Sequence, residues 1–84
     1  MDEKLRQSLE QLHTELEQTQ SLDDETRKLL EHLMQDIQTV LQSSSPKSYA
    51  LLGKRLRDAI QELQESHPSL VLTIGRVLDH LAQV

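Results

Sequence analysis

Residues 43–48 read Ser-Ser-Ser-Pro-Lys-Ser and divide an otherwise helical chain into two halves. Serine side chains compete with helices for backbone hydrogen bonds, and Pro46 disfavours helical geometry at the preceding Ser45. The segment is therefore interpreted as a linker between a first half, residues 1–42, and a second half, residues 49–84. Because 84 residues leave room for one core only, both halves belong to a single domain, residues 1–84.

The half before the linker carries two helical patterns. Between residues 2 and 18, leucines recur at spacings of four, three and four, which places them on one face of a helix; they are Leu5, Leu9, Leu12 and Leu16. Ser21, followed by Asp23, Asp24 and Glu25, is typical of the start of a second helix. The core positions expected in that helix are Leu30, Leu33, Ile37 and Val40.

The half after the linker carries two more. Ser48 is expected to cap a third helix, whose apolar positions are Tyr49, Leu52, Leu56, Ala59, Ile60 and Leu63. Pro68 ends this helix and suits the first position of a fourth, and His67 is expected to cap the fourth helix or to accept a hydrogen bond from Ser69. The fourth helix carries Leu70, Val71, Ile74, Val77, Leu78, Leu81 and Val84, with Leu72 on the opposite side.

Four helices joined by short connections predict an all-α fold, an up-down-up-down four-helix bundle made of two helical hairpins. Homodimerisation that completes or extends the bundle stays open as an alternative. Gly53 and Gly75 lie inside predicted helices, where glycine costs about 1 kcal/mol relative to alanine. We expect both to permit a close approach between helices.

The composition excludes several classes of function. Without cysteine the chain has no disulfide, thiolate zinc site, iron–sulfur cluster or cysteine nucleophile. The start of the chain lacks a signal-peptide pattern and the longest apolar run, residues 49–52, has four residues, so a cytoplasmic protein is expected. The net charge of −5 gives no overall attraction to nucleic acid or membrane; a basic patch on the third helix is the local exception: Lys47, Lys54, Arg55 and Arg57, with Arg76.

The charge is unevenly divided between the two halves. Residues 1–42 carry a net charge of −6, whereas residues 43–84 carry +1. This asymmetry could dock the two hairpins or two subunits through Lys54, Arg55 and Arg57. Solvated helix faces with weak ion pairs explain the same pattern.

Metal binding is an alternative function that the sequence leaves open. Di-iron bundles use Glu-x-x-His pairs, and Glu10 with His13 has that spacing, with Glu17 one turn further on. The sequence contains no second Glu-x-x-His pair, and the leucine face places these side chains beside the core.

The sequence also lacks a Gly-x-Ser-x-Gly elbow and a glycine-rich phosphate loop, so we expect no enzyme activity and no cofactor.

Four segments carry a resemblance to a known family: Leu12-His13-Thr14-Glu15-Leu16-Glu17, Asp23-Asp24-Glu25-Thr26-Arg27, Leu33-Met34-Gln35-Asp36-Ile37 and Glu65-Ser66-His67-Pro68-Ser69-Leu70. Together they resemble a family of short bacterial proteins catalogued as a domain of unknown function. The resemblance implies a helical fold and a bacterial origin. It implies no catalytic or binding residue.

The function expected from these observations is protein–protein contact. The fourth helix is the most apolar, and Leu72, Leu78 and Leu81 are the candidate partner-binding residues. The expected partner is a second copy of the chain or another protein. Metal binding through Glu10, His13 and Glu17, and weak nucleic-acid contact through the basic patch, are the alternatives.

Overall fold

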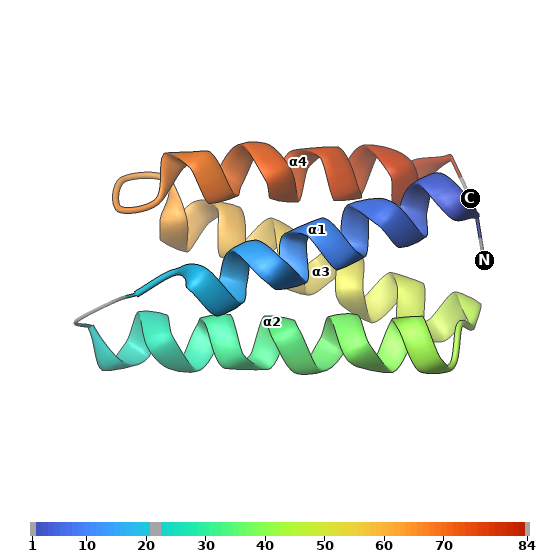
Figure 1. Ribbon diagram of the computed structural model, residues 1–84, viewed down its shortest axis with the longest axis horizontal. Coiled ribbons are helices and arrows are strands. Elements are labelled where there is room, and N and C mark those ends of the chain that lie inside the picture. The colour runs from blue at the N-terminus through green and yellow to red at the C-terminus, as the bar shows by residue number, and fades with distance from the viewer. Residues whose placement is uncertain (1, 21–22, 84) are drawn as a thin grey trace.

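The described part of the computed structural model, residues 2–20 and 23–83, forms four antiparallel α-helices (Figure 1). They are α1 (Glu3–Gln18), α2 (Asp24–Gln42), α3 (Pro46–Leu63) and α4 (Pro68–Ala82). Each helix packs against two neighbours, so that α1 contacts α2 and α4, and α3 also contacts α2 and α4. The predicted up-down-up-down bundle of two hairpins is confirmed.

Two aspartates begin the helices of the first hairpin. The Asp2 carboxylate accepts a hydrogen bond from the Lys4 amide at 2.8 Å, and the Asp23 carboxylate accepts one from the Glu25 amide at 3.1 Å. Each carboxylate satisfies an amide that has no partner within its helix and lies at the positive end of the helix dipole. Ser21, expected near the second of these starts, lies outside the described residues.

The third helix begins earlier than expected, at Pro46, so the prediction that Ser48 is its N-cap is wrong. Ser45 is the N-cap: its hydroxyl accepts a hydrogen bond from the Ser48 amide at 3.1 Å, and the Ser48 hydroxyl accepts one from the Ser45 amide at 3.0 Å. This reciprocal pair is a capping box. Pro46 fits the first helical turn because its missing amide would have no partner there.

The fourth helix has no side-chain cap, which contradicts the role expected for His67. His67 does occupy the N-cap position, but its side chain makes no capping hydrogen bond. Its backbone carbonyl accepts a hydrogen bond from the Val71 amide at 3.3 Å. The corner therefore depends on Pro68, which starts α4 without an amide that needs a partner.

A single core runs between the four helices and is closed within one chain. Its buried side chains come from every predicted apolar stripe: Leu5, Leu9, Leu12, Leu16, Leu30, Leu33, Ile37, Val40, Leu52, Leu56, Ala59, Leu63, Leu70, Ile74 and Val77. Tyr49, Leu78 and Leu81 are partly buried and pack against it. The four helices of one chain thus form the bundle without a second copy.

The helices have 15 to 19 residues, and most of the exposed side chains on them are polar. Within residues 2–20 and 23–83, no helix has the length and apolar content that crossing a lipid bilayer requires.

Candidate functional site

A shallow groove lies between α3 and α4 and is open to the surface. It has a volume of about 230 Å³ and is lined by Tyr49, Ala50, Gly53, Arg57, Leu78, Leu81 and Ala82. The apolar side chains of Tyr49, Leu78 and Leu81 are only partly covered by the bundle core. The small residues Ala50, Gly53 and Ala82 leave the surface hollow. The groove thus combines partly exposed apolar side chains with room above them.

The structure brings together two of the three predicted partner-binding residues. Leu78 and Leu81 line the groove, three residues apart on α4. Leu72 is 72% exposed and does not line it. Nine residues separate Leu72 from Leu81, which is about two and a half turns, so their side chains point to opposite sides of α4.

The arginine in the groove shares its wall with a glycine. An added Cβ on Gly53 would lie 3.7 Å from the Arg57 Nη2 atom, an ordinary van der Waals distance, and one on Gly75 would meet nothing within 4 Å. The prediction that both glycines permit close helix packing is therefore wrong, because an added Cβ at either position would lie within 4 Å of no atom of a neighbouring helix. Within the described residues, Arg57 has no hydrogen-bond or ion-pair partner.

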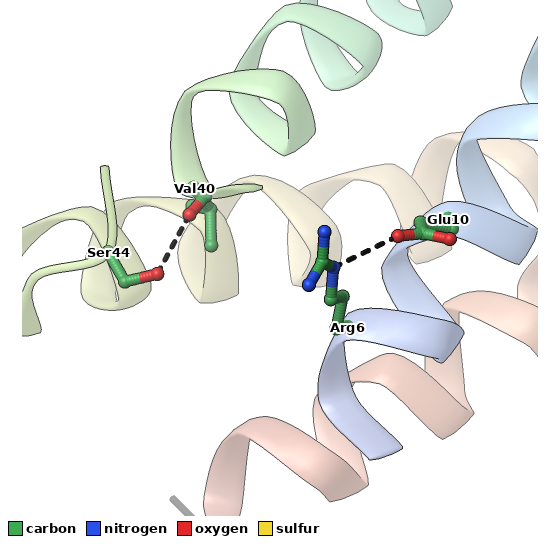
Figure 2. Close-up of polar contacts among 4 residues, drawn as sticks. All are labelled: Arg6, Glu10, Val40 and Ser44. Atoms are coloured by element: carbon green, nitrogen blue, oxygen red, sulfur yellow. Dashed lines mark hydrogen bonds and ion pairs between the residues drawn. The ribbon is translucent and has the colours of Figure 1, made fainter. Parts of the chain in front are cut away.

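The predicted metal ligands do not converge on one point. Figure 2 shows the Arg6 guanidinium beside Glu10, where Arg6 Nε lies 3.2 Å from Glu10 Oε1. His13 Nδ1 lies 2.8 Å from Glu17 Oε1, and His13 Nε2 lies 3.3 Å from the Gln38 side-chain nitrogen. Across residues 2–20 and 23–83, no group of three or more histidine, aspartate or glutamate side chains could hold a metal ion.

The second hydrogen-bonded pair drawn in Figure 2 lies at the C-terminal end of α2. The Ser44 hydroxyl donates a hydrogen bond to the Val40 carbonyl at 2.9 Å. Val40 is in the last turn of the helix, where carbonyls lack amide partners within the helix. Ser44 of the serine-rich segment thus has a structural role.

The predicted basic patch is spread around α3. The Arg55 Nε atom lies 3.1 Å from Asp36 Oδ2 on α2, an ion pair without an aligned hydrogen bond. Arg57 lines the groove on the side of α4, and Lys47 and Lys54 are exposed. Arg55 and Arg57 thus face different neighbouring helices, which leaves no single surface on which all the cations meet.

Two polar contacts that the sequence did not predict join α1 to α4. The Thr73 hydroxyl lies 3.0 and 2.9 Å from the two carboxylate oxygens of Glu15 and donates its hydrogen to that carboxylate. Seven residues away on each helix, the Ser8 hydroxyl is hydrogen-bonded to His80 Nδ1. Both pairs therefore share one antiparallel register. Together they fix the first helix against the last.

Comparison with known proteins identifies a family that matches nearly the whole chain. A family model described as Domain of unknown function (DUF4404) matches residues 5–84. The chain belongs to this family, which confirms the resemblance seen in its sequence. No curated protein and no solved structure shows significant similarity to it.

Proposed function

We propose that this member of the DUF4404 family is a non-catalytic protein that acts through contact with another protein chain, and that the α3–α4 groove is its contact surface. The carrying observation is the pair Leu78 and Leu81, which lie beside Tyr49 in an open groove of about 230 Å³. Partly buried apolar side chains beside an open hollow favour binding, because covering them removes more apolar surface from water.

The remaining predicted residue adds a second, smaller apolar surface. Leu72 stands alone on the outer side of α4 at 72% exposure. Single exposed leucines are common on protein surfaces. The groove therefore carries the proposal, and Leu72 does not belong to it.

Site-specific photo-cross-linking tests this proposal in cells that make the protein. A photoreactive amino acid replaces Ala50, which lines the groove and is exposed, or Lys28, which is exposed on α2. We expect a discrete adduct at position 50, with a second copy or with another protein, and none at position 28. Equal labelling at the two positions, or no adduct at position 50, would contradict a contact function for the groove.

A further inference from the structure

The groove has a charged wall as well as an apolar floor. Arg57 lies within it, and Lys54, one turn earlier on α3, is exposed; neither side chain has an ion-pair partner among the described residues. Asp58 and Asp79, which are also exposed, are the nearest acidic residues in the sequence. Among the described residues that line the groove, Arg57 is the only charged one, so the side-chain charge within the groove is positive.

The helical walls of the groove favour a helix as its occupant. Two antiparallel helices form its walls, and its apolar residues Leu78 and Leu81 are three apart on one of them. An amphipathic helix occupies such a groove with apolar side chains at spacings of three and four. Gly53 and Ala50 leave the α3 wall low, which admits a third helix beside the two that are present.

A second copy of the chain does not match these requirements. Over residues 2–20 and 23–83, the large apolar side chains that are exposed are Leu51, at 58%, and Leu72, at 72%. They lie on different helices, so within the described residues no helix presents two large apolar side chains that are as exposed as these.

We propose that the α3–α4 groove binds an acidic amphipathic helix of another protein. Apolar side chains of that helix, three or four residues apart, contact Tyr49, Leu78 and Leu81, and one of its carboxylates pairs with Arg57. Apolar burial provides the attraction, and the arginine selects an acidic helix over a basic one. This inference rests on the proposed function and specifies the class of partner.

Tryptophan fluorescence gives a direct binding assay because the chain has no tryptophan. The probe is a synthetic helical peptide with leucines on one face, glutamates on the other and one tryptophan. The control peptide keeps the leucines and replaces each glutamate with lysine. We expect the acidic peptide to bind at least about tenfold more tightly than the basic peptide, and this difference to shrink as salt is added.

Variants of the full chain locate the binding site. Arg57→Glu should reverse the preference, so that the basic peptide binds more tightly than the acidic one. Gly53→Leu should weaken both, because the leucine side chain fills the groove; leucine is also the better helix former, and circular dichroism verifies the fold. Lys28→Glu makes the same change of charge on α2, outside the groove, and should keep the preference for the acidic peptide.

The outcomes separate this inference from the function on which it rests. Three results would overturn the proposal of an acidic helical partner. They are equal binding of the two peptides, no binding of the acidic peptide, and binding that survives both Arg57→Glu and Gly53→Leu. If cross-linking at position 50 still yields a discrete adduct, the contact function stands with a partner of different chemistry. If that adduct is absent as well, both proposals fail.

Discussion

At the scale of single residues, Thr73 is the one buried polar side chain among those described, at 7% exposure. Its hydroxyl donates to the half-buried Glu15 carboxylate across the α1–α4 interface. Thr73→Val keeps the shape of the side chain and removes the donor. We expect a loss of about 1 kcal/mol in the free energy of unfolding, because the carboxylate keeps its partial burial without its partner. Urea unfolding followed by circular dichroism measures this loss.

Thr14→Val is the matched control for that substitution. Thr14 is exposed on α1, and its hydroxyl donates to the Glu10 carbonyl within the same helix. Its replacement should change the free energy of unfolding by no more than about 0.5 kcal/mol. Equal losses in the two variants would mean that the contact with Glu15 contributes nothing specific.

The Thr73–Glu15 contact is one that local sequence patterns do not predict. Leucine spacing predicted the buried stripe of α1 correctly, because burial repeats with the period of the helix. Thr73 and Glu15 flank their stripes and are 58 positions apart, so no local pattern pairs them. The groove was only half predicted for a similar reason. Leu78 and Leu81 follow from α4, whereas Tyr49 and Arg57 join them only once α3 is docked beside α4.

At the scale of the helix, the starts of α1 and α2 were predicted well, whereas the caps predicted for α3 and α4 were wrong. Asp2 and Asp23 stand beside clear acidic first turns, and each caps its helix. Before α3, however, Ser45 and Ser48 both offer a hydroxyl at a suitable distance from the helix start. The capping box uses both, with Ser45 as N-cap and Ser48 in the first turn. Sequence alone does not rank two such serines, because each can satisfy the same backbone amides.

Gly75 gives a prediction at the same scale. It lies in the interior of α4, and an added Cβ would meet nothing within 4 Å. Gly75→Ala should therefore raise the free energy of unfolding by about 0.5–1 kcal/mol, through the higher helix propensity of alanine and the reduced freedom of the unfolded chain. Thermal and urea unfolding measure the change.

Gly53→Ala is the comparison within α3. Its added Cβ would lie at 3.7 Å from Arg57 Nη2, which leaves the methyl group in ordinary contact. A gain of similar size is expected there. A loss of stability in the Gly75 variant would show that α4 needs the space for its own packing and would contradict the account of both glycines.

At the scale of the whole molecule, the four apolar stripes meet inside one chain, and the excess of negative charge lies on one of its two hairpins. The acidic first hairpin, with a net charge of −6, forms the α1–α2 side of the bundle, and the second hairpin, with +1, forms the α3–α4 side. The sequence predicted this division because each hairpin is continuous along the chain. Docking of two copies depends instead on how well their surfaces match in shape and charge. The spacing of apolar residues along a helix does not predict this match.

Sedimentation equilibrium tests directly whether two copies of the chain associate. The core is closed, and the described surface exposes large apolar side chains at the isolated positions Leu51 and Leu72. We therefore expect the mass of one chain, 9.7 kDa, from micromolar to millimolar concentration. A dimer that dissociates as salt is added would contradict this expectation and show that the charge asymmetry docks two copies. A dimer that persists in salt and is lost in Gly53→Leu would instead place a second copy in the α3–α4 groove, because salt screens charge pairs and leaves apolar burial intact.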